Sequence, residues 1–271
     1  MSKRLTIIPF GGLGNRLRVL NSAIYFSKEI DSEIELIWFK KAELFADFQQ
    51  IFDGVGANLK ITKGIKYKIL KLTTKHIYVQ KYEKLFRLVF RLFYDEVLFD
   101  SDISGTTYKE IFKRINNGKS VLIATCYQFY GFPNFNNFTV KKMLREEIDS
   151  FGIDENYVGI HIRMTDHSEI MNESPLENYK RKMLESLEIN PQTKFYLSSD
   201  DDSVKERLNN EFGERIKVQE VPLERSSIEG IFGAIIDVYN LSRCSAIICN
   251  PKSSFAIMAS QIGNPKPLII V

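Results

Sequence analysis

An imidazole and a guanidinium stand two residues apart at the end of an apolar run. The run begins at Tyr157, and its last three residues are His161, Ile162 and Arg163. If the run is a β-strand, His161 and Arg163 point to the same face, because side chains alternate along a strand. The planar fork of arginine matches two oxygens of a diphosphate. The pair therefore predicts a site for a phosphorylated ligand. The simpler alternative is a strand-end histidine and arginine that are paired with carboxylates of the protein.

A glycine-rich turn near the N-terminus is a second candidate for phosphate or sugar binding. Gly12, Gly14, Asn15 and Arg16 lie between a β-rich run and a helical pattern. Glycines let backbone N–H groups approach a ligand closely, and a helix N-terminus favours an anion. The dinucleotide-binding fingerprint would require a third glycine or an alanine where Leu17 stands. The turn predicts a contact with a phosphate or a sugar, and the alternative is a tight strand-to-helix turn without a ligand.

Two further polar clusters follow apolar runs in the second half of the chain. The first contains Asp200 and Asp201, and a carboxylate there can accept hydrogen bonds from both N1–H and the N2 amine of guanine. The second contains Ser253, Ser254 and Phe255. Hydroxyls and backbone N–H groups at the start of a helix can hold a phosphate. In both clusters the alternative interpretation is helix capping.

The elements that must position these clusters are strands alternating with helices. From residue 157 onward, apolar strand-like runs alternate with helical patterns, and the polar clusters come at the ends of the runs. This alternation is typical of a parallel sheet covered by helices on both faces, whose ligands bind beyond the carboxyl ends of the strands. The strand, glycine turn and helix at the N-terminus predict a second unit of this kind. We expect domains at residues 1–150 and 151–271.

An acidic pair offers a different chemistry. Asp100 and Asp102 follow the apolar run 97–99, and carboxylates at positions i and i+2 could hold Mn²⁺ or Mg²⁺ on a nucleotide diphosphate. This pattern would fit a metal-dependent glycosyltransferase of the GT-A type. The alternative is an acidic turn in water. A metal site here would leave the His161–Arg163 strand and the serine cluster unexplained.

The composition is that of a globular protein. The chain has 271 residues, of which 44% are hydrophobic and 26% charged, and these values exclude general disorder. The N-terminal apolar run is too short for a signal peptide, and no run of about 18 apolar residues exists. Cys126, Cys244 and Cys249 form no CxxC pair, which favours free thiols in a reducing cytosol. We therefore expect a cytoplasmic location.

Positive charge is concentrated in residues 60–91. This segment has ten lysines or arginines and one acidic residue, Glu83, although the net charge of the chain is only +3. Its second half, 82–93, has apolar residues at helical spacing. An amphipathic basic helix predicts contact with an anionic surface, such as a lipid-linked acceptor or the inner membrane. The alternative is a helix whose apolar face packs in the core and whose lysines lie in water.

The order of these clusters resembles that of the GT-B fucosyltransferase superfamily, which includes nodulation α-1,6-fucosyltransferases, α-1,2-fucosyltransferases and protein O-fucosyltransferases. The resemblance rests on Gly-Gly-Leu-Gly-Asn-Arg-Leu-Arg at the first turn and on Val-Gly-Ile-His-Ile-Arg, Phe-Tyr-Leu-Ser-Ser-Asp-Asp, Asp-Val-Tyr-Asn-Leu-Ser-Arg-Cys and Ser-Ser-Phe further on. It covers the turn and nearly all of residues 157–263. The chain departs from the α-1,2 enzymes at Arg16 and Arg18, where those carry glutamine and aromatic residues.

The resemblance implies an α/β fold with two Rossmann-like domains facing across a cleft, the GT-B type. The N-terminal domain would face the acceptor, and the C-terminal domain would bind the nucleotide sugar. Arg163 would hold the β-phosphate of GDP-fucose, His161 would lie near the ribose or phosphate, and Asp200 would read guanine. The remaining donor-binding residues would come from the turn and the two polar clusters: Gly12, Gly14, Asn15, Arg16, Asp201, Ser253, Ser254 and Phe255.

The function that follows is transfer of a sugar, L-fucose from GDP-fucose, to a glycan or lipid-linked oligosaccharide acceptor in bacterial polysaccharide biosynthesis. Arginine and helix N-termini can stabilise the leaving diphosphate without a metal or other cofactor. Inversion calls for a base, and Asp166 and Glu169 are candidates by position. A non-catalytic nucleotide- or polysaccharide-binding protein on the same scaffold is the other alternative. We expect no nucleic-acid binding, because the basic run lacks a recognisable module.

Overall fold

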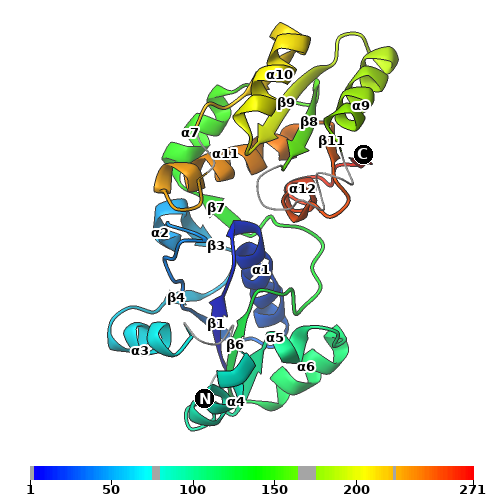
Figure 1. Cartoon of the computed structure of the whole chain (residues 1–271). Coiled ribbons are helices and arrows are strands. Elements are labelled where there is room, and N and C mark those ends of the chain that lie inside the picture. Colours follow the sequence, from blue (N-terminus) through cyan, green and yellow to red (C-terminus); the bar gives the residue numbers. More distant parts are fainter. Residues whose placement is uncertain (1–2, 75–79, 164–174, 222–223) are drawn as a thin grey trace. The chain divides into compact units, whose positions relative to one another are not determined.

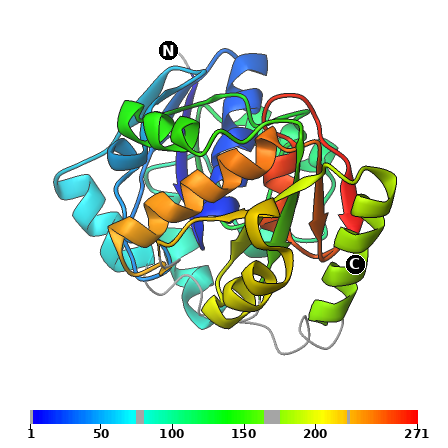
Figure 2. The same ribbon diagram turned by 90° about the horizontal axis from the view of Figure 1, so that it is seen from above.

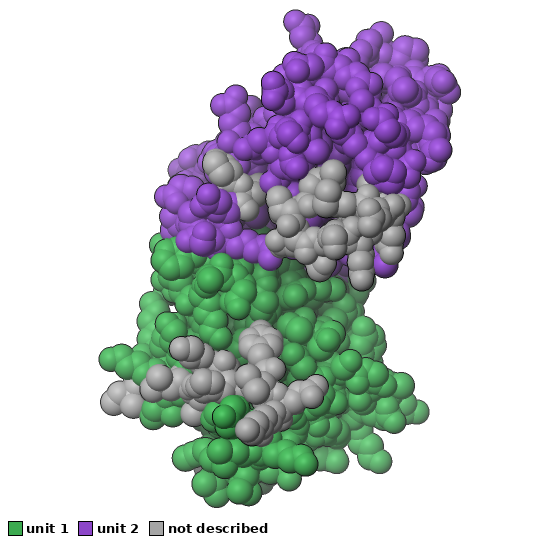
Figure 3. All heavy atoms as spheres, in the orientation of Figure 1, with its two compact units in different colours: residues 1–133, 137–139 green, residues 134–136, 140–271 purple. Residues whose placement is uncertain are grey.

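The chain divides into two compact units. A computed structural model describes residues 3–74, 80–163, 175–221 and 224–271. Unit 1 comprises Met1–Pro133 and Asn137–Thr139, and unit 2 comprises Asn134–Asn136 and Val140–Val271 (Figure 3). The predicted boundary after residue 150 lies too late in the chain. Helix α7 (Lys142–Ser150) belongs to unit 2, because it packs against helix α11 (Ile228–Arg243) of that unit and buries its Leu144 and Ile148.

The core of unit 1 is a parallel sheet of five strands. Their order is β4 (Leu59–Ile61), β2 (Glu33–Leu36), β1 (Arg4–Pro9), β6 (Ser120–Thr125) and β5 (Glu96–Phe99) (Figure 1). The helices are α1 (Leu13–Glu29), α2 (Phe48–Ile51), α3 (Ile65–Thr74), α4 (Gln80–Phe90), α5 (Asp100–Ile103) and α6 (Tyr108–Asn117). Leu70 of α3 and Phe90 of α4 share a buried cluster with Ile8 and Leu122 of the sheet, so α3 and α4 cover the same face.

The sheet of unit 2 is also parallel and has the strand order of a Rossmann fold. The order is β10 (Ile216–Val218), β9 (Lys194–Ser199), β8 (Tyr157–Ile162), β11 (Ala246–Cys249) and β12 (Leu268–Ile270). Numbered along the chain, these strands read 3-2-1-4-5. The order therefore reverses between β8 and β11, and sheets of this kind bind ligands at such a switch point.

Helices cover both faces of the sheet of unit 2. Helices α9 (Leu176–Ile189) and α10 (Asp202–Phe212) pack on one face, where Met183 and Leu208 join a buried cluster with Ile160. Helix α11 (Ile228–Arg243), orange in Figure 2, crosses the other face. It lies so close to β8 that a Cβ on Gly159 would come within 2.8 Å of Leu241 Cδ2. Glycine at this position permits the close contact. The remaining elements are helix α12 (Ser254–Ser260) and a 3₁₀ turn, Gly213–Arg215.

Several local expectations are corrected by the structure. Within residues 43–51 only the short α2 is helical, because a β-bridge between Lys41 and Leu44 and a non-helical Asp47 precede it. A separate two-stranded sheet of β3 (Phe52–Val55) and β7 (Phe138–Val140) was not predicted. The three cysteines are free, as expected. Among the described residues, no helix combines the length and the apolar character that crossing a membrane requires.

Candidate functional site

The carboxyl ends of three strands meet at the switch point of unit 2. In the parallel register, His161 of β8 lies beside Cys249 of β11 on one side and Ser198 of β9 on the other. The loops that follow these strands therefore begin next to one another. Arg163 follows β8, Asp200 follows β9, and the serine cluster follows β11. Parallel pairing thus brings together three of the predicted clusters, which are separated by many residues in the sequence.

His161 is in contact with two residues of the serine cluster. Its Nδ1 lies 2.9 Å from Ser253 Oγ, and its ring stacks on Phe255 with 4.9 Å between the ring centroids and 24° between the planes. Ser253 Oγ also accepts a hydrogen bond from Ala256 N at 3.1 Å, so it caps helix α12. Ser253 thus follows the capping alternative, and the same hydroxyl also touches the imidazole. Its contact with a phosphate stays a prediction.

The imidazole of His161 is neutral near pH 7. Burial lowers its pKa to about 4, while the negative charge of Asp200 raises the pKa and the positive charge of Arg163 lowers it further. The charges of Arg163 and Asp200 therefore both act on this ring. Ser253 Oγ accepts from Ala256 N and has one proton that it can donate to Nδ1. In the tautomer that matches this bond, the ring proton is on Nε2, which is then a neutral hydrogen-bond donor.

Arg163 is partly buried and lies one residue beyond the end of β8. This position keeps the guanidinium at the carboxyl end of the sheet, where the sequence predicted it. The two candidate bases, Asp166 and Glu169, lie outside the described residues.

The two adjacent aspartates after β9 have different environments. Asp201 is the N-cap of α10, where its Oδ1 accepts from Ser203 N at 2.8 Å and from Val204 N at 3.2 Å. These bonds lower the pKa of Asp201, with the hydroxyl of Ser203 as the largest cause. Asp201 thus follows the capping alternative. Asp200, partly buried and one residue nearer the strand, is the better placed of the two to meet a ligand.

A buried carboxylate that the sequence reasoning left without a role holds the end of β9 in place. Asp237 of α11 accepts from Tyr196 Oη at 2.6 Å and from Ser198 Oγ at 2.7 Å. It is fully buried, and burial raises its pKa to about 6 against the opposing effect of these hydrogen bonds. Asp237 thereby ties α11 to the strand that carries Asp200. Asp237 is the first residue of the Asp-Val-Tyr-Asn-Leu-Ser-Arg-Cys motif, and this motif was the sequence feature that could have drawn attention to it.

The glycine turn of unit 1 forms the start of α1. Gly12 is the N-cap and offers no side-chain cap. Gly11 has φ +79°, and a Cβ there would come within 2.7 Å of Asn15 Nδ2, so both backbone angle and space require glycine. A Cβ on Gly14 would meet nothing within 4 Å. Asn15 Oδ1 accepts a hydrogen bond from Arg18. The turn joins strand β1 to helix α1 as predicted. Ligand binding by the turn stays a prediction.

Arg16, predicted to bind the donor, is instead a buried structural residue. It is 1% exposed. Its Nε donates to Gly11 O at 2.7 Å, one terminal nitrogen donates to Phe39 O at 2.6 Å, and the guanidinium lies 5.1 Å from the centre of the Trp38 ring. Arginine satisfies carbonyls that would otherwise be buried without donors. Arg16 thus joins the turn to the segment after β2.

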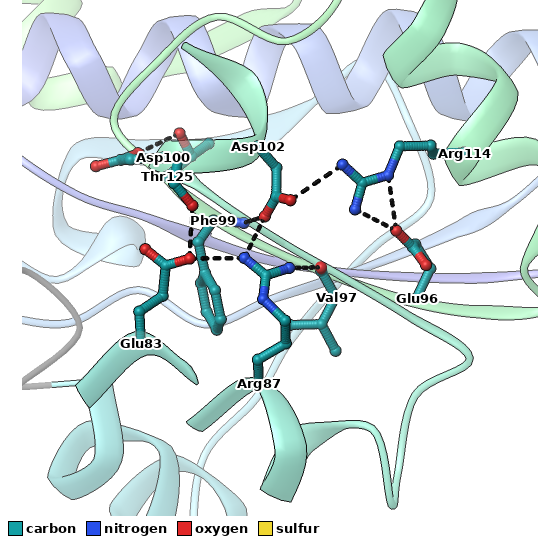
Figure 4. A network of polar contacts seen from close by, with 10 residues as sticks. Glu83, Arg87, Glu96, Val97, Phe99, Asp100, Asp102, Arg114 and Thr125 are labelled. Atoms are coloured by element: carbon teal, nitrogen blue, oxygen red, sulfur yellow. Dashed lines mark hydrogen bonds and ion pairs between the residues drawn. The ribbon is translucent and has the colours of Figure 1, made fainter. Parts of the chain in front are cut away.

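The acidic pair Asp100 and Asp102 is bound by donors of the protein. Asp102 accepts from Arg87 at 2.6 Å, from Phe99 N at 2.8 Å and from Arg114 at 3.0 Å (Figure 4). The hydrogen bonds from Arg87 and Phe99 lower the pKa of Asp102 against the effect of burial. Asp100 accepts from Thr125 Oγ1 at 2.5 Å and from Cys126 N at 2.9 Å. Two guanidinium groups on one carboxylate oppose a cation there, so the structure does not support the alternative of a metal pair at Asp100 and Asp102.

Comparison with known proteins identifies the fold. No protein-family model and no curated protein sequence matches the chain. Its structure is similar to NodZ α-1,6-fucosyltransferase of Bradyrhizobium, in a crystal soaked with GDP-fucose, with a TM-score of 0.64, 14% identity, and coverage of 97% of this chain and 93% of that one. A mutant of Arabidopsis thaliana FUT1 in complex with GDP has a TM-score of 0.64, 13% identity, and coverage of 99% and 70%.

POFUT1 in complex with GDP is a third similar structure, with a TM-score of 0.55, 12% identity, and coverage of 99% of this chain and 98% of that one. These similarities extend over nearly the whole of this chain. The chain therefore has the α/β fold of the GT-B fucosyltransferases, as the sequence motifs predicted. The similarity shows the fold, and the activity has to be argued from the site.

Proposed function

We propose that this protein is a glycosyltransferase that transfers L-fucose from GDP-fucose to a glycan acceptor by a metal-independent, inverting mechanism. The observation that carries the proposal is the site at the switch point of unit 2. There His161 contacts both Ser253 and Phe255, and the charges of Arg163 and Asp200 act on the same imidazole. The solved structures of similar fold that bind GDP or GDP-fucose support this choice of donor.

The residues of this site divide the tasks of binding a donor and stabilising its leaving group. Arg163 forms the bidentate contact with the β-phosphate, and its effect grows as negative charge develops on the departing diphosphate. His161, neutral and protonated on Nε2, donates to an oxygen of the ribose or phosphate. The start of α12, at Ser253 and Ser254, adds backbone N–H groups and a favourable dipole.

In this proposal Asp200 selects guanine as the nucleobase of the donor. Its carboxylate accepts from N1–H and the N2 amine of guanine, a pair of donors that adenine and uracil do not present. Phe255 holds the imidazole from one side and forms an apolar wall of the donor site. In unit 1, Gly12, Gly14 and Asn15 form the turn that we propose for contact with the donor. Asp166 and Glu169 stay as candidate bases for the acceptor hydroxyl.

The acceptor and the cellular setting are also part of the proposal. A glycan or a lipid-linked oligosaccharide would receive the sugar, in bacterial polysaccharide biosynthesis. The protein would work in the cytoplasm, in peripheral contact with the inner membrane through residues 60–91. The concentration of positive charge in that segment supports the contact.

A thermal-shift screen with GDP, UDP, ADP and CMP tests the donor. A ligand that binds only the native state raises the melting temperature, and its stabilisation at a hundred times Kd is about 2.7 kcal/mol. We expect GDP to raise the melting temperature and the other nucleotides to leave it unchanged. The same shift with UDP alone would contradict the assignment of Asp200.

Activity assays separate the proposed enzyme from its two alternatives. Release of GDP from GDP-fucose, with and without acceptor, distinguishes an active enzyme from a non-catalytic binding protein. EDTA distinguishes the proposed mechanism from a metal-dependent one, because Arg163 and the start of α12 supply the positive field. We expect turnover to persist in EDTA. Loss of turnover with EDTA, restored by Mn²⁺, would return Asp100 and Asp102 to consideration.

A further inference from the structure

Helix α4 and the turn after it carry a row of large apolar side chains that remain exposed. Leu85, Leu88, Leu92 and Phe93 are 56%, 68%, 78% and 69% exposed. We call this surface the α4 outer face; with its two less exposed members it comprises Tyr82, Leu85, Leu88, Val89, Leu92 and Phe93. Exposed apolar side chains elsewhere in the described chain are more scattered, as is normal on a protein surface. A contiguous row of this kind marks an interaction surface.

The side of α4 opposite the outer face makes the contacts of this helix with the rest of unit 1. Phe90 is buried in the cluster of the sheet, and Phe86 packs against that cluster. Arg87 bonds to Glu83, Asp102 and the carbonyl of Val97 (Figure 4), and its guanidinium lies 4.9 Å from the centre of the Phe99 ring. These contacts fix the rotation of the helix about its axis. The outer face is therefore held away from the core.

The outer face forms one continuous stripe. Helical hydrogen bonds continue past Phe90, since Arg91 N donates to Arg87 O and Leu92 N donates to Val89 O. With about 100° between successive residues, the six outer side chains fall within an arc of roughly 140°. The sequence predicted one apolar face over 82–93, and the alternative placed it in the core. The structure divides these residues, because only Phe86 and Phe90 pack inward.

Positive charge borders the stripe. Lys84 and Arg91 are exposed on α4 itself, and by helical geometry they lie along one edge of the arc. On α3, which covers the same face of the sheet, exposed Lys68 and Lys71 flank Ile69, which is 54% exposed. The one acidic residue of the segment, Glu83, is bound to Arg87 and to Ser101 Oγ. The exposed charges of α4 beside the stripe, Lys84 and Arg91, are thus positive.

We propose that the α4 outer face docks onto an anionic lipid bilayer. An apolar stripe with lysine and arginine at its edge matches the boundary between acyl chains and anionic head groups, into which such a face sinks by about 5–10 Å. Protein interfaces are in contrast depleted of lysine. This inference deepens the membrane contact proposed above for residues 60–91 and assigns it to one face of α4. It does not depend on the proposed donor, because lipid binding is measured without donor or acceptor.

Vesicle flotation with the full-length chain tests the proposal. The vesicles contain phosphatidylcholine alone or with about a third phosphatidylglycerol. We expect binding to the anionic vesicles that weakens with added salt. Leu88→Ser/Leu92→Ser should lower the partition coefficient about tenfold or more, and Lys84→Glu/Arg91→Glu at least about 25-fold, since each basic residue contributes about fivefold. Equal binding to both vesicle types, or unchanged binding of these variants, would overturn the proposal.

Matched controls separate a local effect from general changes in surface charge or folding. Ile189→Ser changes an apolar residue of unit 2 that is 87% exposed, and Lys109→Glu reverses a charge at an exposed position of α6. Both should bind like the parent chain. All variants change exposed side chains, so their melting temperatures and their thermal shifts with GDP should be unchanged. A failure of the donor proposal would therefore leave the lipid result intact.

A fluorescence reporter and a measurement of mass complete the test. The chain has a single tryptophan, Trp38, which is buried. Leu92→Trp therefore adds a reporter in water, and its emission should shift to shorter wavelength with anionic vesicles only. Sedimentation equilibrium gives the oligomeric state. A dimer that Leu88→Ser/Leu92→Ser dissociates, without vesicle binding by the parent chain, would instead make this face an interface between two copies.

Discussion

Arg163 is the residue whose replacement tests the proposed chemistry most directly. If it holds the β-phosphate, its stabilisation increases as the diphosphate departs, so its loss lowers kcat and not merely the affinity for donor. We expect Arg163→Ala to lower kcat by about 10²–10³, the loss measured for comparable charge-stabilising donors. Arg163→Lys should fail nearly as badly, because it keeps the charge but loses the planar fork.

The test of Arg163 requires a control replacement at a surface arginine and a check that the variants fold. Arg181 of α9 has a side chain that is 63% exposed and an ion pair with Glu185 at 3.8 Å, and exposed pairs of this kind contribute little. Arg181→Ala should keep full turnover. Circular dichroism should show that both Arg163 variants are folded. Near-normal kcat in a folded Arg163→Ala protein would refute the proposed role.

His161 predicts a pH dependence of stability. Its pKa is about 4 in the folded chain, against 6.5 for the unperturbed group. Between these values the unfolded chain takes up a proton that the native chain does not, so the free energy of unfolding falls as the pH drops from about 6.5 to 4. The loss amounts to at most about 1.4 kcal/mol per pH unit. His161→Gln should remove this contribution in urea unfolding at pH 7 and pH 5.

Asp237 changes the free energy of unfolding with pH in the direction opposite to His161. The contribution of His161 therefore has to be measured as a difference between the parent chain and a histidine variant. The pKa of Asp237 rises from 3.8 to about 6 on folding, so the native chain holds the extra proton in that window. The contribution of Asp237 to stability therefore falls as the pH rises from about 4 to 6. The difference between the parent chain and His161→Gln isolates the histidine. An identical pH dependence in the two proteins would contradict its lowered pKa.

At the scale of elements, the glycine turn and α1 depend on Arg16. Replacing it with alanine leaves the carbonyls of Gly11 and Phe39 without their buried donor and removes the contact with Trp38. We expect Arg16→Ala to lower the free energy of unfolding by about 3 kcal/mol, since a hydrogen bond with a charged partner contributes about 1.5–3 kcal/mol. Lys109→Ala, at an exposed position of the same unit, is the control. A stable Arg16→Ala protein that fails only to bind GDP would restore the predicted ligand role.

The network around Asp102 fixes three helices on the edge strand β5. Asp102 lies in α5 and binds Arg87 of α4 and Arg114 of α6 (Figure 4). Asp102→Ala leaves two half-buried guanidinium groups without this partner, so we expect a loss of about 2–3 kcal/mol in the free energy of unfolding. GDP release by the folded fraction should be unchanged and still resist EDTA. Full stability with abolished turnover would favour the metal-dependent alternative.

At the scale of the whole molecule, the proposed donor contacts are distributed unequally between the two units. His161, Arg163, Asp200 and the serine cluster belong to unit 2, and the glycine turn belongs to unit 1. GDP should slow amide hydrogen exchange at the start of α12 and after β9, because these backbone groups become bound or covered. UDP should not. Slowed exchange confined to unit 1 would contradict the assignment of the donor to unit 2.

The sequence by itself determined the elements of unit 2 and the residues at the strand ends. The alternation predicted from residue 157 onward is present, with β8 followed in the chain by α9 and then by β9. Periodicity is a local property, and a regular alternation of strand and helix permits few topologies. The motifs that surround His161 and Ser253 could therefore be placed at one edge of a sheet before the structure was known.

Only the tertiary structure decided what each polar side chain does. Arg16 is buried although Gly14 and Asn15 of the same turn are not, Asp201 caps a helix, and Asp102 binds two arginines from distant helices. The division of α4 into a packed and an exposed side has the same origin. Burial and partners arise from contacts between residues far apart in the chain, and local spacing contains no information about them.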